Sequence, residues 1–156
     1  AEWMKELNEK GEYKIGTELQ NQILKDFFGT WVDEVETRET IGDVYNNYGY
    51  VMDPHTAVAY KAMEKYRLMT GDETYSIVLS TASPFKFNDV VLASIDPDTY
   101  EGKELDPFVA MEDLSRLAKL PIPASMQELP KLQRRQSDVV DKTQLEAEVK
   151  KLLGLK

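Results

Sequence analysis

The apolar run at 75–80, YSIVLS, constrains the fold of this chain more than any other segment. The run is short and continuous and follows the turn formers Gly71 and Asp72, which is typical of a strand buried on both faces of a parallel sheet. Its neighbours along the chain have helical patterns instead, and a single strand cannot form a sheet because its backbone groups need partners on both sides. We therefore expect either part of a larger α/β protein or an unusual helical domain with one strand.

The helical segments are marked by apolar side chains at helical spacing and by signals at their ends. The clearest start is Asp53-Pro54, because aspartate is a favoured N-cap and proline fits the first helical position. Within that helix, an apolar stripe is predicted to be buried; it comprises Ala59, Ala62, Met63 and Tyr66. Further helices are expected at about 1–10, 17–27, 35–48, 84–94, 108–120, 125–129 and 142–153. Thr17 and Asp141 are predicted caps of the helices that they precede, and the prolines of PIP at 121–123 are predicted to end the helix at 108–120. Residues 12–15 are a weaker strand candidate, 96–107 a predicted loop and 134–141 a predicted extended segment.

Composition limits the function classes that fit the chain. A length of 156 residues suits one domain with its own core, and a net charge of -9 disfavours nucleic acid or an anionic membrane as the main partner. The chain has no cysteine and one histidine, His55, which excludes disulfides and thiolate nucleophiles and leaves no expected metal site. The charged first residues and the lack of a long apolar run indicate a cytoplasmic location.

Two motifs, DPHTAVAY at 53–60 and STASPFKF at 80–87, carry a resemblance to a known family. With MKELNEKGEYKI, the rest of DEVETRETIGDVYNNYGYVMDPHTAVAY, YSIVL and PIPASMQEL, they resemble in order the C-terminal part of bacterial and fungal threonine synthases. The resemblance covers nearly the whole chain. It implies an α/β fold class: the mostly helical C-terminal part of a tryptophan-synthase-β-like, fold type II pyridoxal phosphate enzyme, with few strands here. Residues 1–104 would complete the cofactor-binding domain, and 105–156 would form a helical extension.

The resemblance also implies an activity, the conversion of O-phospho-L-homoserine and water into L-threonine and phosphate. In the family, the Schiff-base lysine and the glycine-rich phosphate loop lie upstream of the part that this chain resembles. The segment PFKFND imitates the lysine motif, but Phe87 replaces its aspartate, so Lys86 is not expected to be that lysine. No catalytic residue is therefore assigned, and the chain is expected to be inactive without the rest of its own protein.

Two alternatives stay open from the residues themselves. One is a stand-alone acidic helical module without catalysis that binds a protein partner through an exposed apolar face, such as that of 145–153. The other is a related pyridoxal phosphate enzyme that acts on another amino acid, because most substrate contacts would lie upstream.

Thr81 is the principal candidate for cofactor binding. The resemblance places its hydroxyl at the pyridine nitrogen of the cofactor. Because a hydroxyl is too weak an acid to protonate the ring, the neutral pyridine would be a weaker electron sink than a pyridinium. The residues alone also allow Thr81 to satisfy backbone groups at a strand-to-helix turn. Ser80 and Ser83 are weaker members of the same set, and Ser83 is in addition a predicted helix cap.

Three further residues are expected at the rim of the active site. Asp53 and His55 belong to the DPHT turn, and we expect His55 to shape the site rather than to transfer a proton. Lys86 lies in a first helical turn, where a cation opposes the helix dipole; this placement favours an anionic partner over an idle surface charge.

Overall fold

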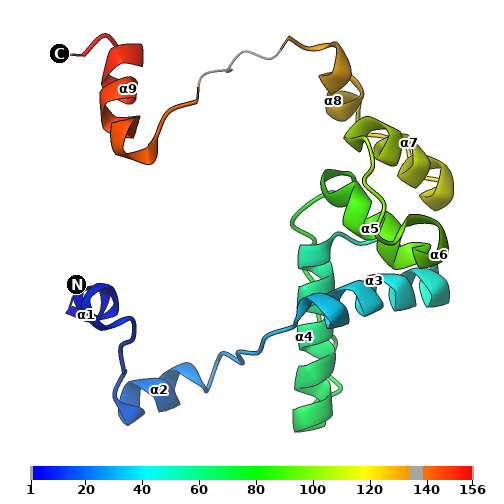
Figure 1. Cartoon of the computed structure of the whole chain (residues 1–156). Helices are drawn as coiled ribbons and strands as arrows, with labels where there is room; N and C mark the ends of the chain where they lie inside the picture. Colours follow the sequence, from blue (N-terminus) through cyan, green and yellow to red (C-terminus); the bar gives the residue numbers. More distant parts are fainter. Residues whose placement is uncertain (1, 134–138, 156) are drawn as a thin grey trace. The chain divides into compact units, whose positions relative to one another are not determined.

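A computed structural model of the chain describes residues 2–133 and 139–155, which are mostly helical and include no strand (Figure 1). Contacts within the chain divide it into two units, Ala1–Pro121 and Ile122–Lys156. The predicted boundary at 104/105 is of another kind, because it separates the cofactor-binding domain of the whole enzyme from its helical extension. That boundary stays a prediction.

The helices of the first unit are α1 (Glu2–Lys10), α2 (Thr17–Ile23), α3 (Glu34–Tyr48), α4 (Pro54–Thr70), the 3-10 turn η1 (Pro84–Phe87), α5 (Asn88–Ile95), α6 (Pro97–Tyr100) and α7 (Pro107–Ala118). Those of the second unit are α8 (Ala124–Gln127), the 3-10 turns η2 (Leu129–Lys131) and η3 (Lys142–Gln144), and α9 (Leu145–Leu152).

Aspartate caps begin the longer helices, and glycines end two of them. Asp33 caps α3 in a capping box with Glu36, and Asp53 caps α4 ahead of Pro54 at its first position. The chain leaves α3 and α4 through Gly49 and Gly71 in the left-handed conformation, with φ of 66° and 69°. The predicted ends of these helices are confirmed.

Other predicted boundaries were wrong. Thr17 is the first residue of α2 rather than its cap, and α2 ends at Ile23 because no residue of it is buried and no packing prolongs it. The predicted loop at 96–107 contains α6, which begins at the cap Asp96. Lys119, with φ of 55°, ends α7 before the prolines are reached.

The core of the first unit is formed where α5 packs against α3 on one side and α7 on the other (Figure 1). Its side chains without solvent exposure include Ile41, Ala57, Val91, Leu92, Ala110 and Leu114. A Cβ atom built on Gly42 of α3 would lie 2.7 Å from the carbonyl oxygen of Ser94 in α5. The absence of a side chain at Gly42 therefore sets how closely these two helices approach.

The predicted stripe on α4 is not buried. Ala59 is exposed and Ala62, Met63 and Tyr66 are half-buried, whereas the buried residues of α4 are Thr56 and Ala57. The reason is geometric: α4 crosses α3 instead of running beside it, so only a short part of α4 is covered (Figure 1).

The predicted strand at 75–80 does not form, nor does the weaker one at 12–15, because no other strand is present in the described part of the chain to complete a ladder. The segment instead runs back along α4 (Figure 1). Arg67 holds it there by donating hydrogen bonds to the carbonyl of Thr74 (2.9 Å) and to the hydroxyl of Ser76 (3.2 Å). Its large apolar side chains remain exposed: Tyr75, Ile77 and Leu79.

The second unit has no buried residue in its helices. Asp141 caps the turn that leads into α9, as predicted, and accepts a hydrogen bond from the backbone N–H of Thr143 (2.8 Å). The apolar face of α9 is exposed; it comprises Leu145, Val149, Leu152 and the following Leu153. Residues 134–138 of the predicted extended segment lie outside the described residues.

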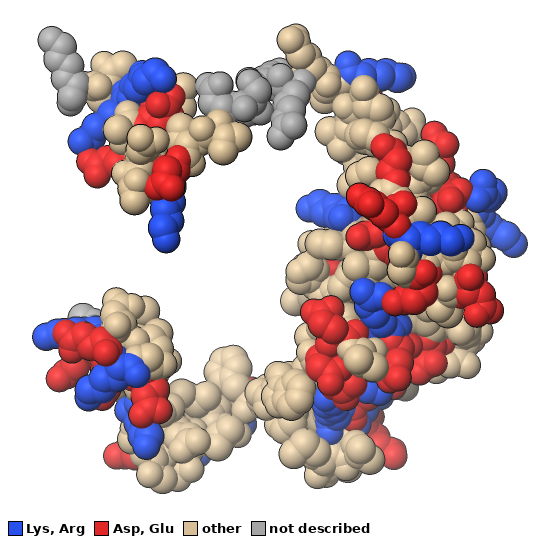
Figure 2. Space-filling model, in the orientation of Figure 1, with Lys and Arg blue, Asp and Glu red and all other residues tan. Residues whose placement is uncertain are grey.

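Acidic and basic side chains lie interspersed on the face shown in Figure 2. One ion pair joins Arg38 to Glu101, with a separation of 3.3 Å. No helix within the described ranges has the length and apolar character needed to cross a bilayer.

Candidate active site

Asp53 is the centre of a buried hydrogen-bond network at the start of α4. Its side chain has no solvent exposure. The carboxylate accepts hydrogen bonds from the backbone N–H of His55 (3.0 Å) and from the hydroxyl of Thr56, and it lies 3.1 Å from Nδ1 of the His55 ring. The N-cap position explains these contacts, because it directs the carboxylate at the first turn of its own helix.

The Asp53 carboxyl is held in its ionised form. Burial raises its pKa, and the hydrogen bonds from Thr56 and His55 lower it by more, so that the pKa lies below its ordinary value. A buried charge is thus compensated by hydrogen-bond donors rather than by an adjacent lysine or arginine.

Thr56 links this network to the end of the 75–80 segment. Its hydroxyl oxygen lies 3.2 Å from that of Ser80, which is 24 residues further along the chain. The structure therefore brings three of the predicted site residues, Asp53, His55 and Ser80, into one network. Thr56 was predicted only as the last residue of the DPHT turn and was not assigned to the site; the available signal was a threonine three residues after an aspartate N-cap, a spacing that favours side-chain contact.

Phe87 was not assigned to the site either. Its ring packs on the ring of His55, with the two centroids 5.0 Å apart. The rings are tilted by 55°, and the contact joins η1 to the start of α4. The His55 side chain remains 62% exposed.

The remaining predicted residues lie beside this network rather than in it. Ser83 caps η1 as predicted, because its hydroxyl accepts from the backbone N–H of Phe85 (3.3 Å). Thr81 and Lys86 are exposed. Across residues 2–133 and 139–155, no hydrogen bond or ion pair joins Thr81, Ser83 or Lys86 to Asp53, so the roles of these three side chains at a site stay predictions.

A cavity of about 490 Å³ opens beside the network, between α3, α4 and the 75–80 segment. Thr56 and Ser80 form part of its wall, and the others are mainly aromatic and apolar side chains with one cation, Arg67. A mostly apolar cavity with a few convergent polar groups is the usual form of a small-molecule site.

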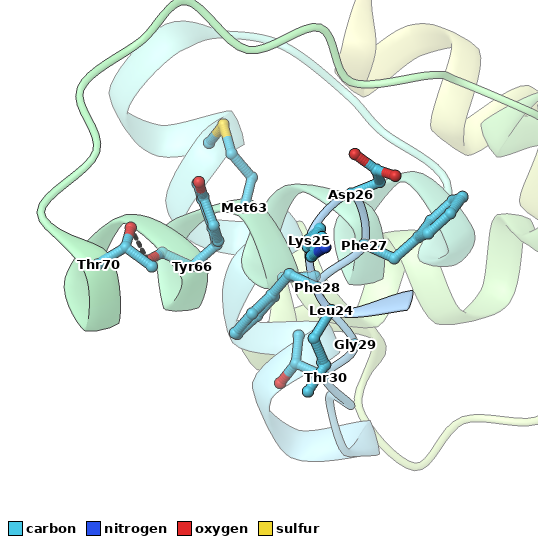
Figure 3. A pocket seen from close by; sticks show the side chains of 11 residues that line it. Leu24, Lys25, Asp26, Phe27, Phe28, Gly29, Thr30, Met63, Tyr66 and Thr70 are labelled. Atoms are coloured by element: carbon cyan, nitrogen blue, oxygen red, sulfur yellow. Dashed lines mark hydrogen bonds between the residues drawn. The ribbon is translucent and has the colours of Figure 1, made fainter. Parts of the chain in front are cut away.

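A larger hollow, of about 720 Å³, lies between 24–30 and the second half of α4 (Figure 3). Phe28 packs edge to face on Tyr66 there, with ring centroids 5.2 Å apart. None of the predicted site residues lines this hollow, and its charged members, Lys25 and Asp26, are solvent-exposed. We therefore place the candidate site at the smaller cavity, which shares residues with the Asp53 network.

Neither region holds a metal site: within the described residues, no group of three or more His, Cys, Asp or Glu side chains could bind a metal ion.

The fold is therefore that of a helical domain in which a DPHT turn, with Asp53 and Thr56 buried, is joined to a hydroxyl-rich STAS segment. Residues 56–152 match the family described as "Threonine synthase, C-terminal", and the chain belongs to this family. The predicted resemblance to the C-terminal portion of threonine synthases is confirmed.

Individual relatives agree with the family. The chain is 33% identical over 123 residues to the threonine synthase of Saccharomyces cerevisiae, covering 76% of this chain and 24% of that protein. It is 34% identical over 93 residues to that of Schizosaccharomyces pombe, covering 58% and 18%. It is 27% identical over 96 residues to the human protein "Threonine synthase-like 1", covering 61% and 12%. The chain thus spans about a quarter or less of the curated relatives it matches.

Proposed function

We propose that this chain is the C-terminal portion of a threonine synthase. The whole protein would convert O-phospho-L-homoserine and water into L-threonine and phosphate with pyridoxal phosphate, and this portion would be inactive without the rest. The match of residues 56–152 to the C-terminal family carries the proposal, because it includes both Thr56 and the STAS segment.

The same proposal includes the fold type II architecture. Tyr75, Ile77 and Leu79 are 102%, 90% and 72% exposed, which is unusual for an apolar run of this kind. We propose that 75–80 adds a strand to a sheet formed elsewhere in the whole protein. Such pairing would satisfy its backbone groups and cover these side chains.

The polar groups at the end of this segment fit the pyridine ring of the cofactor. Asp53 is the nearest carboxylate to Ser80 in the network, but it is fully buried and already occupied by Thr56 and His55. The hydroxyls of Thr81 and Ser83 are then the groups able to donate to a ring nitrogen, with Ser80 beside them, and hydroxyls suit an unprotonated pyridine. When bound, the cofactor supplies an electron sink for carbanion chemistry.

Within this site, each side chain has a limited role. Exposed Thr81 would donate its hydroxyl hydrogen to the ring nitrogen and so orient the ring, with Ser80 and Ser83 beside it. Asp53 and His55 would shape the rim, and Lys86, in η1, would attract an anionic group of the substrate. The Schiff-base lysine and the phosphate loop would come from the rest of the protein.

The test uses the complete enzyme with the variants Thr81→Val and Thr81→Ser. We expect Thr81→Val to lower phosphate release from O-phospho-L-homoserine by about tenfold and to shift the cofactor absorbance, because one hydrogen bond to the ring is lost. Thr81→Ser keeps the hydroxyl and should retain most of both properties. Unchanged turnover together with an unchanged spectrum in Thr81→Val would contradict the assignment.

Two other candidate functions have a specific observation behind them. The match to a protein named "Threonine synthase-like 1" shows that the chain also resembles a protein described as like threonine synthase, and one alternative is a related enzyme that acts on another amino acid. Turnover of a different phosphorylated hydroxy amino acid in preference to O-phospho-L-homoserine would establish it. The exposed apolar face of α9 favours a binding module. Three observations together would establish it: the 156 residues fold cooperatively, they bind no cofactor, and the gene has no upstream coding region for an enzyme.

A further inference from the structure

In the Asp53 network, the donor and the acceptor of each hydrogen bond can be assigned. An ionised carboxylate accepts hydrogen bonds and donates none, so every polar neighbour must present a hydrogen to it. The donors around Asp53 keep its pKa below the ordinary value, so the carboxylate is ionised at neutral pH. The positions of the hydrogens on His55 and Thr56 follow from this.

His55 must carry a hydrogen on Nδ1, the ring atom that lies 3.1 Å from the Asp53 carboxylate. In the neutral imidazole, one nitrogen carries the hydrogen and the other has a free lone pair. Nε2 of neutral His55 is therefore an acceptor. The ring is 62% exposed, and no hydrogen bond to Nε2 is formed by the residues that the structure describes.

The same reasoning fixes the contact between Thr56 and Ser80. A hydroxyl has one hydrogen, and that of Thr56 is donated to Asp53. The 3.2 Å contact between the hydroxyl oxygens must then be a hydrogen bond in which Ser80 donates to Thr56. Ser80 has no second hydrogen, so its oxygen offers lone pairs to the 490 Å³ cavity that it lines.

We propose that Asp53 makes both His55 Nε2 and Ser80 Oγ hydrogen-bond acceptors, so that each of them receives a donor group of the substrate, such as its protonated amine. They do not receive the carboxylate or the dianionic phosphate ester of the substrate, whose oxygens have no hydrogen to donate. His55 and Ser80 are positioning residues in this scheme. Thr81, outside the network, remains the hydroxyl that is free to donate to a ring nitrogen. The identity of the ligand as a substrate rests on the proposed function, whereas the hydrogen-bond directions do not.

The directions can be measured without any enzyme activity. His55 is the single histidine of this chain, so its ¹⁵N resonances in the 156-residue protein need no assignment. We expect the neutral ring to carry its hydrogen on Nδ1 and the Nδ1–H form to dominate. Thr56→Val, which keeps the contact between Asp53 and His55, should leave this preference in place, and Asp53→Asn should reduce it. A neutral ring with its hydrogen on Nε2 in the unsubstituted chain would overturn the proposal, whatever the enzyme does.

The class of ligand is tested in the complete enzyme with its cofactor. Ser80→Ala and His55→Phe should each raise KM for O-phospho-L-homoserine by about tenfold, the effect of one hydrogen bond, with little change in kcat. His55→Gln, which restores an acceptor, should recover part of the loss.

Inhibition by sulfate, a tetrahedral anion that carries no hydrogen at neutral pH, separates the two kinds of ligand. It should be unchanged in Ser80→Ala and His55→Phe, and weaker inhibition in either variant would show that these residues bind an anionic group and would refute the proposal. A holoenzyme that releases no phosphate from O-phospho-L-homoserine would instead refute the proposed function, while the tautomer result would stand by itself.

Discussion

Replacing Asp53 by alanine tests how much the buried network stabilises the fold. The substitution removes the N-cap of α4, which costs about 1 kcal/mol of unfolding free energy. It also removes the hydrogen bond that the hydroxyl of Thr56, a residue only 4% exposed, donates to the ionised carboxylate, and this costs about 2 kcal/mol more. We therefore expect Asp53→Ala to lower the free energy of unfolding by about 3 kcal/mol.

Asp106 provides a matched control in the same chain. It also caps a helix ahead of a proline, and it accepts from the backbone N–H groups of Phe108 (2.9 Å) and Val109 (3.2 Å), but it is exposed and has no buried hydroxyl partner. Asp106→Ala should therefore cost only about 1 kcal/mol. Urea unfolding followed by circular dichroism gives both values. Equal losses in the two variants would show that burial and the Thr56 contact add nothing to an ordinary cap.

Two further predictions concern packing and acid stability. Gly42→Ala should lower the unfolding free energy by about 2 kcal/mol, because the added Cβ meets the Ser94 carbonyl. Gly29 lies in open space, so Gly29→Ala should change the unfolding free energy by less than about 0.5 kcal/mol. Equal effects of the two substitutions in urea unfolding would contradict the close approach of α3 and α5. Hydrogen bonds from the hydroxyl and backbone of Thr74 lower the pKa of Asp72 to about 2, so its stabilising effect is complete above the ordinary aspartate pKa and is lost as pH falls towards 2. A carboxyl ¹³C titration should show this midpoint, and Thr74→Ala should raise it; an ordinary midpoint in the unsubstituted chain would disprove the arrangement.

Helix ends were predictable because their signals are local. The Asp53-Pro54 start and the glycines at 49 and 71 act through backbone conformation and contacts within one turn, and such contacts depend little on the rest of the fold. The same holds for Asp53 and His55 as neighbours, since they lie two residues apart in a capping turn.

Features that depend on distant partners were not predictable. The run at 75–80 has the composition of a strand, yet a strand is defined by its neighbours and the described part of the chain supplies none. The contact of Thr56 with Ser80 spans 24 residues and needs the packing of the segment against α4. The apolar stripe on α4 stays uncovered for a similar reason, because periodicity predicts a face but not the element that covers it.

The location of the buried core has a practical consequence for dissecting this protein. Among the described residues, all buried residues lie between Thr37 and Leu114, whereas the family match begins at residue 56. A recombinant fragment trimmed to the matched span would lose α3, with Ile41 and Val44, as well as Asp53 itself. A fragment that begins before the cap Asp33 and ends after α7 retains every buried residue. The residues that form the buried core and the residues that match the family are therefore different, overlapping parts of this chain.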